Sequence, residues 1–450
     1  MAAAVAYKRM SHSGSDPEQV VQPTTPSEIA AILRSPQRYP SPVRPLGSGS
    51  STTRCLDAHG GTRLDLSKMN RILRITGDSV TVQPGVSLPE LADRLREEGL
   101  ELVGGFDLAT RTVGGAVCAA GLEAATSGDA GQFAAHVIKL KVVSPQGKKF
   151  EVTQKSKTLL GIIRLSYGLL GVVYEITLKI RPIRGFEVRT AKIGFADFRK
   201  LAPRLAAAGS GVKLFLLPFR DRIYIELRSP APDGYPGRKF AWRLKDWACY
   251  SALPDAARSL ARVVPIRQLR YPLIDSLSEA AQSLVNNAMM HSGSNSVEQS
   301  GRFRRLKTND HFTYCTWAFP AAKFGAVAIA YRDLCKKHYE RSGFRCDMPA
   351  IGFRLNQDRS ALLAPSFNEP MFTISALSTQ PGSAWKDFLL EFSYFAEKYD
   401  GVPFFNQTQG MTAELIAKRF GERLAFFRKA RREMDPNDRL LNQYFAAYVQ

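Results

Sequence analysis

Two glycine-rich turns constrain this chain more than any other feature. The first reads VRPLGSGSST from Val43 to Thr52, and the second reads RTVGGAVCAAG from Arg111 to Gly121. Each stands beside a β-rich segment, and roughly one small subdomain separates them. Because glycine has no Cβ, main-chain N–H groups can converge there on a bulky anionic group. One such turn is weak evidence for a phosphate-binding loop, but two in this order favour that interpretation.

Composition limits the remaining possibilities. The chain has 450 residues and a hydrophobic content of 44%, which suggests two domains rather than one core. We find no apolar run of about 18 residues, and the first residues lack the apolar region of a secretory signal. Six cysteines without CxxC spacing and six dispersed histidines argue against a zinc site or a disulfide framework. We therefore expect a cytoplasmic enzyme without a metal.

The charge favours anionic partners. Lysine and arginine number 62 against 41 acidic residues, a net charge of +21. Basic residues alternate with aromatic ones from Arg238 to Arg270, and further basic residues cluster from Arg302 to Lys307. These segments are either a solvated face of a helical insertion or a docking surface for an anionic membrane or substrate. Nucleic acid is not expected as a partner, because no zinc finger or RNP-like motif accompanies the charge.

The pattern along the chain predicts two α+β domains. Residues 1–182 combine short strands with a few amphipathic helices, such as capped helices over 26–34 and 86–99. From residue 183 onward, strand-like segments alternate with long helices, which predicts a mixed or antiparallel sheet. Near the end, Glu414 to Met434 is predicted as one basic amphipathic helix that stops at Asp435-Pro436.

The order of motifs resembles a known family over almost the whole chain. The segments PSEIAAIL, GSGSS, TVQPGVSLPEL, TVGGAV, KVVSPQGK and LSYGLLGVVYEITLKIRP resemble the PCMH-type FAD-binding domain of the vanillyl-alcohol oxidase superfamily. The ending FRKARREMDPNDRLLNQYF is similar to the C-terminal segment of the sugar-lactone and polyol oxidases of that group. This resemblance implies a two-subdomain FAD-binding domain over residues 1–182 and an α+β substrate domain over 183–405. A C-terminal segment over 406–450 would return to the flavin.

The same resemblance implies which residues hold FAD. Main-chain N–H groups of the two turns would bind the pyrophosphate rigidly. In the first turn these residues are Leu46, Gly47, Ser48, Gly49, Ser50 and Ser51, and in the second they are Thr112, Val113, Gly114 and Gly115. Gly168, Gly171 and Val173 would flank the adenosine and the flavin, and Asn442 would reach back toward the flavin.

One departure from the family concerns the attachment of FAD. Many relatives carry in the first turn a histidine that is covalently bonded to the flavin, whereas this chain has Ser50 there. No cysteine occupies the usual second attachment position. We therefore predict non-covalent FAD, which favours dehydrogenase or reductase chemistry over oxidase chemistry.

A second departure follows the second turn. Polyol and lactone oxidases have a run of small residues ending in HG there, but this chain reads AAGLEAATSGDAGQF. This segment resembles the sterol side-chain reductases of the same superfamily. The resemblance places Glu123 near the flavin edge as a catalytic candidate, whereas the alternative is a solvated loop carboxylate.

Three further catalytic candidates come from the second half of the chain. Arg354 matches the arginine of a Glu–Arg pair in polyol oxidases, although Gly352 replaces the glutamate. It would stabilise a developing alkoxide or orient a substrate oxygen, unless it is a surface arginine on a strand. Asn406 lies where relatives place a catalytic lysine or a His-Trp pair. Tyr314 alternates onto the same strand face as Thr316 and would face the flavin.

These features favour an FAD-dependent oxidoreductase that transfers hydride from a CH–OH group to flavin N5. The substrate would be a sugar, polyol, lactone or lipid-linked group, although the missing Glu–Arg pair and lysine disfavour a simple polyol or aldonolactone. The alternative is a reductase of a carbon–carbon double bond in a hydrophobic, sterol-like substrate. A flavin-free binding protein is the least favoured class. The electron acceptor and the oligomeric state stay open.

Overall fold

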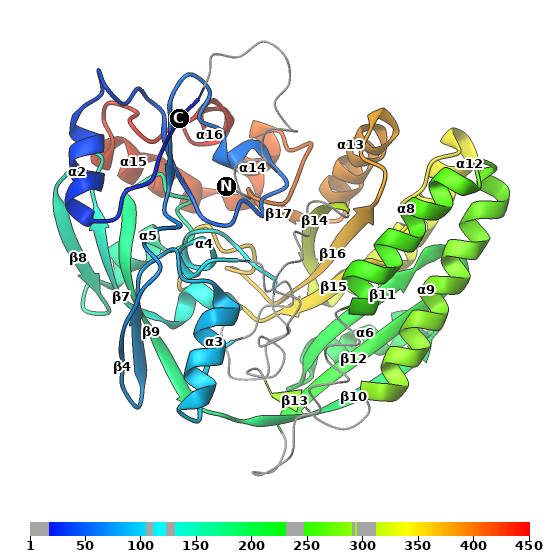
Figure 1. Ribbon diagram of the computed structural model, residues 1–450. Helices are drawn as coiled ribbons and strands as arrows, with labels where there is room; N and C mark the ends of the chain where they lie inside the picture. Colours follow the sequence, from blue (N-terminus) through cyan, green and yellow to red (C-terminus); the bar gives the residue numbers. More distant parts are fainter. Residues whose placement is uncertain (1–17, 105–110, 123–130, 231–246, 290–292, 295–311) are drawn as a thin grey trace.

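The computed structural model describes residues 18–104, 111–122, 131–230, 247–289, 293–294 and 312–450, which form two lobes (Figure 1). The N-terminal lobe contains two sheets. One is a three-stranded parallel sheet in the order β1-β3-β2. The other is antiparallel in the order β4-β5-β9-β7-β8, with β6 paired to β9. The chain enters the C-terminal lobe between β9 and β10.

The N-terminal lobe has these strands: β1 Gln19–Val21, β2 Val43–Leu46, β3 Thr62–Asp65, β4 Ile72–Ile75, β5 Ser79–Val82, β6 Leu100–Leu102, β7 Val137–Val143, β8 Lys149–Thr153 and β9 Val172–Pro182. Its helices are α2 Pro26–Arg34, η1 Arg54–Leu56, α3 Leu88–Glu97, α4 Val113–Cys118, η2 Phe133–His136 and α5 Lys157–Ile163. Capping fixes where the longer helices begin. The Thr25 hydroxyl accepts a hydrogen bond from the main-chain N–H of Glu28, and the Ser87 hydroxyl accepts one from that of Glu90.

The C-terminal lobe is built on one eight-stranded sheet in the order β13-β10-β12-β11-β15-β16-β14-β17. Its pairs are antiparallel. The strands are β10 Gly185–Ile193, β11 Gly211–Leu217, β12 Arg222–Pro230, β13 Gly293–Ser294, β14 Thr313–Pro320, β15 Ala350–Leu355, β16 Met371–Ser378 and β17 Val402–Pro403. The helices are α6 Phe195–Ala207, η3 Pro218–Arg220, η4 Ala248–Ala252, α8 Leu253–Val263, α9 Arg267–Met289, η5 Ala321–Lys323, α12 Phe324–Ser342 and α13 Ser383–Lys398.

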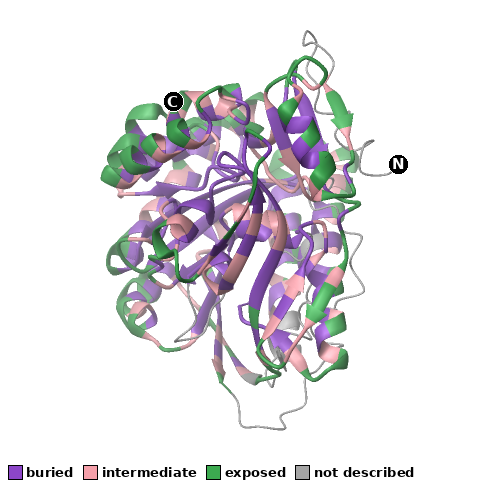
Figure 2. Ribbon diagram, turned by 90° about the vertical axis from the view of Figure 1, so that its left-hand side faces the viewer, coloured by how far each residue is buried: buried purple, intermediate pink, exposed green. Residues whose placement is uncertain are grey.

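The two faces of this sheet have different neighbours. On one face, Phe372 of β16 stacks on Phe324 of α12 with ring centroids 4.6 Å apart. Successive side chains of a strand point to opposite faces, and directly paired residues share a face. Tyr314 and Thr316 therefore lie on the face away from Phe372. Figure 2 shows buried residues concentrated in the strands and exposed ones on the outer helices.

The C-terminal segment returns to the N-terminal lobe through α14 Ala413–Phe420, α15 Glu422–Met434 and α16 Gln443–Val449 (Figure 1). The main-chain N–H of Val43 donates to the carbonyl of Arg439 over 2.8 Å, which ties this segment to β2. The prediction of one helix from Glu414 to Met434 is wrong. Gly421 adopts φ +53° and ψ −134° and separates two helices, a conformation that other residues rarely adopt.

Candidate cofactor cleft and active site

A cleft lies in the N-terminal lobe where the two glycine-rich turns meet. Twelve of the fourteen predicted cofactor residues line it: Leu46, Gly47, Ser48, Gly49, Ser50, Ser51, Thr112, Gly114, Gly115, Gly168, Gly171 and Val173. Val113 and Asn442 are not among its lining residues. Residues that the sequence did not single out also line it, and they include Arg44, Cys55, Pro84, Arg111, Cys118, Ala119 and Tyr167.

The two turns touch each other at Gly47. A Cβ added there would lie 2.5 Å from the Oγ1 atom of Thr112, so a larger residue would push the turns apart. Gly49 adopts φ +68°, which only glycine adopts readily, and this lets the first turn curl along the cleft. The sequence pattern therefore encodes the path of the main chain around the cleft.

The main-chain donors of the two turns differ. In the second turn, the N–H groups of Val113 and Gly114 donate to the carbonyls of Val86 and Pro84 over 2.8 and 2.9 Å. The N–H of Gly115 donates to the Thr112 hydroxyl over 3.2 Å. In the first turn, the N–H groups of Ser48, Ser50 and Ser51 meet no acceptor among the described residues. Three main-chain donors of the first turn are thus open to an anion, whereas those of Val113, Gly114 and Gly115 in the second turn are engaged within the protein.

Two buried arginines border the cleft. Arg44 donates to the carbonyls of Leu440, Cys55 and Tyr167 over 2.8, 2.9 and 2.7 Å. Burial lowers the pKa of its guanidinium to about 10, so it stays positive at neutral pH. Arg111 donates to the carbonyls of Ala119 and Ala120 over 3.0 and 3.2 Å. These contacts fix the cleft wall and place positive charge beside it, which suits an anionic ligand.

The side chains that line the cleft indicate whether FAD could be attached covalently. Ser50 lies in the cleft, and no histidine is found among its described lining residues. Cys55 and Cys118 line it, and Cys118 is a neighbour that the sequence patterns did not reveal. Burial raises the pKa of both thiols, that of Cys118 to about 12. A protonated thiol is a poor nucleophile, so neither cysteine is activated for attachment.

The segment from Phe404 to Gln409 joins both turns to the eight-stranded sheet. The carbonyl of Asn406 accepts from the N–H of Thr52 over 3.0 Å, and its side-chain amide donates to the carbonyl of Ala120 over 3.0 Å. The side-chain oxygens of Asn406 and Gln407 are buried and have no hydrogen-bond partner among the described residues. A buried acceptor without a donor is costly, so this pair is a candidate for hydrogen bonds from a ligand, although neither residue is among those that line the cleft.

Tyr314 reaches the first turn from β14. Its hydroxyl donates to the carbonyl of Ser50 over 3.3 Å. Burial raises the pKa of this phenol to about 12, so it is neutral at ordinary pH. The structure therefore brings Tyr314 and Asn406 together beside the first turn.

Arg354 is not among the residues that line the cleft. On β15 it shares the helix-covered face with its paired residue Phe372. Its guanidinium donates to the carbonyls of Leu205, Ala206 and Ala208 at the end of α6, and to Asn356 over 3.0 Å. Arg354 is 3% exposed, so the surface alternative is wrong. The geometry favours a role in holding α6, and a catalytic role stays a prediction without support from this geometry. Glu123 lies outside the described residues.

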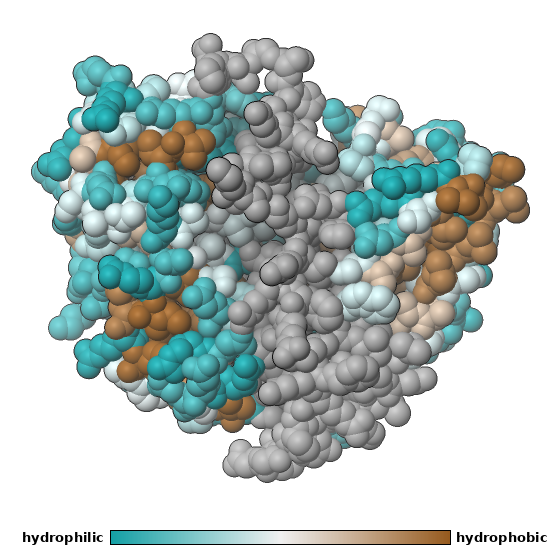
Figure 3. Space-filling view, in the orientation of Figure 1, coloured by the Kyte–Doolittle hydropathy of each residue, from teal (hydrophilic) through white to brown (hydrophobic). Residues whose placement is uncertain are grey.

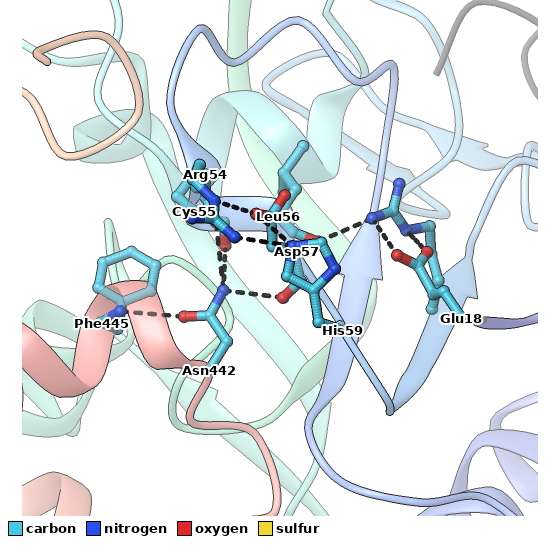
Figure 4. A network of polar contacts seen from close by, with 9 residues as sticks. Glu18, Arg54, Cys55, Leu56, Asp57, His59, Asn442 and Phe445 are labelled. Atoms are coloured by element: carbon cyan, nitrogen blue, oxygen red, sulfur yellow. Dashed lines mark hydrogen bonds and ion pairs between the residues drawn. The ribbon is translucent and has the colours of Figure 1, made fainter. Parts of the chain in front are cut away.

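Asn442 connects the C-terminal segment to the loop after β2 (Figure 4). Its amide nitrogen donates to the carbonyls of Arg54, Cys55 and Asp57 over 3.3, 3.2 and 2.9 Å. Its oxygen accepts from the N–H of Phe445 over 3.0 Å and caps α16. Asn442 thus touches the back of the cleft wall through Cys55, and direct contact with FAD stays a prediction.

The cleft and the large antiparallel sheet define a two-domain flavoprotein oxidoreductase. The family model described as FAD binding domain matches residues 17–153, and the model described as D-arabinono-1,4-lactone oxidase matches residues 263–448. The chain thus has the domain order of an FAD-dependent oxidoreductase, in which a PCMH-type FAD-binding domain is followed by a domain that matches the lactone oxidase model.

The individual relatives include two lactone dehydrogenases and one lactate dehydrogenase. The L-gulono-1,4-lactone dehydrogenase of Mycobacterium tuberculosis is 21% identical over 441 residues, or 95% of each chain. The mitochondrial D-lactate dehydrogenase [cytochrome] of Arabidopsis thaliana is 31% identical over 219 residues, covering 46% of this chain and 38% of that protein. The L-galactono-1,4-lactone dehydrogenase of the same plant is 24% identical, and the match spans 34% of its length.

The fold has solved counterparts. Cholesterol oxidase from Brevibacterium sterolicum matches with a TM-score of 0.77 and 13% identity, over 96% of this chain and 94% of that one. A structure titled solvent-stable cholesterol oxidase gives a TM-score of 0.72 and 14% identity. These likenesses show the two-domain α+β fold, in which a large antiparallel sheet forms the second domain.

Proposed function

We propose that this chain oxidises a CH–OH carbon of a sugar-derived lactone, with non-covalently held FAD as the hydride acceptor. One observation supports the cofactor site above others. The N–H groups of Ser48, Ser50 and Ser51 have no acceptor among the described residues, and they stand in a turn that lines the cleft. The residues present therefore fit a dinucleotide pyrophosphate, which needs such donors.

Non-covalent attachment follows from the side chains of the same cleft. Ser50 cannot form the bond that a histidine forms with flavin. The thiol of Cys118 is buried, and its raised pKa keeps it protonated. Acid should therefore release the flavin from the protein.

Different residues of this chain bind the pyrophosphate and orient the substrate. Ser48, Ser50 and Ser51 donate to the pyrophosphate, and Arg44 and Arg111 add positive charge behind it. Bound FAD supplies a hydride acceptor at flavin N5. The side-chain oxygens of Asn406 and Gln407 accept hydrogen bonds from substrate hydroxyls and so orient the CH–OH carbon.

The hydroxyl proton needs an acceptor of its own. The phenol of Tyr314 is not a base, because burial raises its pKa to about 12. Among the described residues that line the cleft there is no carboxylate or imidazole. We therefore keep Glu123, outside the described residues, as the proposed proton acceptor.

The substrate class rests on the family. The lactone oxidase model matches residues 263–448, which favours a lactone even though Gly352 replaces the glutamate of the Glu–Arg pair. Reduction of a double bond in a sterol-like substrate is the alternative, but its motif, from Gly121 to Phe133, lies mostly outside the described residues. We assign FAD binding to residues 1–182, substrate binding to 183–405 and completion of the FAD site to 406–450.

Anaerobic reduction of the flavin tests this proposal. Purified protein loaded with FAD is mixed without oxygen with aldono-1,4-lactones of different stereochemistry, and the flavin absorbance is followed. Bleaching by a lactone supports the proposal. A flavin that lactones leave oxidised, but that NADPH reduces and an unsaturated sterol reoxidises, would establish the alternative.

A further inference from the structure

Helix α9 exposes the side chains that a helix of a folded domain usually buries. Leu269, Leu273 and Leu277 are 58%, 48% and 44% exposed. Residues four apart lie on one face of a helix, so these leucines form an outward stripe. The inward face carries Tyr271 and Ile274 together with polar Ser278, which are all buried.

The stripe continues across the turn that joins α9 to α8. Val263 is 78% exposed and Ile266 is 54% exposed, and both stand at this turn. Figure 3 shows an apolar strip along the hairpin formed by the two helices, on the right of the view. We call Val263, Ile266, Leu269, Leu273 and Leu277 the hairpin stripe. Large exposed apolar surfaces of this kind mark interaction sites.

Basic residues prevail at the turn end of the stripe, whereas Asp275 and Glu279 flank Leu277 at its other end and pair with Arg345 and Lys192. From residue 256 to residue 274 the sequence contains four arginines and no acidic residue. Arg262 and Arg267 are exposed and flank Val263 and Ile266 at the turn. The Nη1 atom of Arg267 donates to the carbonyl of Gly343 over 3.0 Å. The whole chain carries a net charge of +21.

We propose that the α8–α9 hairpin docks on the surface of an anionic lipid bilayer. The hairpin stripe enters the region between headgroups and acyl chains, and Arg262 and Arg267 contact anionic headgroups. None of the helices in the described ranges is long and apolar enough to cross a bilayer, so the contact stays at one leaflet. A second copy of the chain fits less well, because a two-fold contact through the turn would bring the same arginines together.

Sedimentation with lipid vesicles tests the proposal. The full chain loaded with FAD is mixed with vesicles of phosphatidylcholine alone or of phosphatidylcholine and phosphatidylglycerol in equal parts. We expect binding to the mixed vesicles and at least roughly tenfold weaker binding to the neutral ones. The variant Leu269→Gln/Leu273→Gln/Leu277→Gln should lose at least roughly tenfold in affinity for mixed vesicles. Its flavin content should not change.

A matched control removes exposed apolar side chains elsewhere. Leu73, Leu390 and Phe426 are 43%, 51% and 47% exposed, and they lie on β4, α13 and α15. The variant Leu73→Gln/Leu390→Gln/Phe426→Gln should bind vesicles as the wild type does. Arg262→Gln/Arg267→Gln should lose only the preference for anionic lipid.

Three outcomes would overturn the proposal. The first is wild-type protein that stays in the supernatant with both kinds of vesicle. The second is equal loss of binding in the stripe variant and the control variant. The third is a dimer in sedimentation velocity that the stripe variant abolishes, since a second copy would then cover the stripe.

Discussion

The cofactor cleft and the eight-stranded sheet beside it are built in opposite ways. The cleft is formed by main chain, and its arginines Arg44 and Arg111 bind carbonyls. The sheet contributes side chains, such as the Tyr314 hydroxyl that meets the first turn. The spacing of glycines in a sequence encodes a main-chain path directly, whereas the choice of a side chain on a strand leaves no such pattern. Cleft and sheet should therefore respond differently to substitution.

The two turns of the cleft also differ from each other despite their similar sequences. In the second turn the N–H groups of Val113, Gly114 and Gly115 are engaged within the protein, and the first turn leaves three N–H groups open. The first turn should therefore bind the ligand, and the second should brace the first. Substitutions in each turn can separate these two roles.

The largest effect is expected at the contact between the turns. Gly47→Val would force a Cβ toward the Thr112 hydroxyl, and overpacking of this kind costs about 1–3 kcal/mol. Affinity for FAD should fall on the order of 100-fold, as titration of the apoprotein would measure. The control is Gly77→Val, because nothing lies within 4 Å of a Cβ at Gly77. Equal affinities of the two variants for FAD would contradict the claim that the contact between the two turns shapes the cleft.

The next effect concerns the helix-covered face of the sheet. Arg354→Met removes the donors that hold the end of α6, so the free energy of unfolding should fall by about 2 kcal/mol. Urea denaturation measures the change, and Arg189→Met on exposed β10 is the control. The rate of flavin reduction in the folded variant should not change. A large loss of rate with normal stability would instead establish the catalytic role predicted from the sequence.

A smaller effect tests whether the second turn braces rather than binds. Thr112→Val removes the hydroxyl that accepts the Gly115 N–H, and loss of such a cap costs about 1 kcal/mol. The apoprotein should lose about that much stability, while its affinity for FAD changes less than about threefold. Thr25→Val, which removes the cap of α2 away from the cleft, is the matched control for stability. A collapse of FAD affinity in Thr112→Val alone would show that the second turn binds directly.

The smallest effect is expected at Tyr314. Tyr314→Phe deletes one hydrogen bond to the Ser50 carbonyl, so flavin reduction should slow by about threefold. Because burial raises the pKa of Tyr314 to about 12, its phenol stays protonated at lower pH. The pH profile of the reduction rate should keep its shape between about pH 6 and pH 10. If the wild-type rate changes at alkaline pH and the Tyr314→Phe variant lacks that change, Tyr314 titrates in this range and the prediction is wrong.

The sequence was most informative about main chain and least informative about side chains. The glycine turns, the capped helices at Pro26 and Leu88, and the antiparallel second sheet follow from local patterns. The single helix from Glu414 to Met434 was wrong, because helical periodicity continues across a break at Gly421. The placement of Arg354 depends on which face of β15 is covered by α6, and that follows only from the assembled sheet.

The side chains around the cleft were missed for a related reason. Arg44 lies in the first motif and Cys118 in the second, yet neither has a spacing that marks it as part of the cleft wall. The sequence shows that Gln407 is polar. That its side-chain oxygen is buried without a hydrogen-bond partner follows only from the packing of the segment from Phe404 to Gln409. Helix caps are set by residues close in sequence, whereas these side chains become neighbours only when distant segments pack together.

The most direct test of the central claim is the absorbance spectrum of the purified protein loaded with FAD, before and after precipitation with acid. A cleft that holds FAD through main-chain donors and without a covalent bond predicts a yellow protein and a yellow supernatant. A yellow pellet would contradict the non-covalent attachment at Ser50. A colourless protein after loading with FAD would contradict the assignment of the cleft itself.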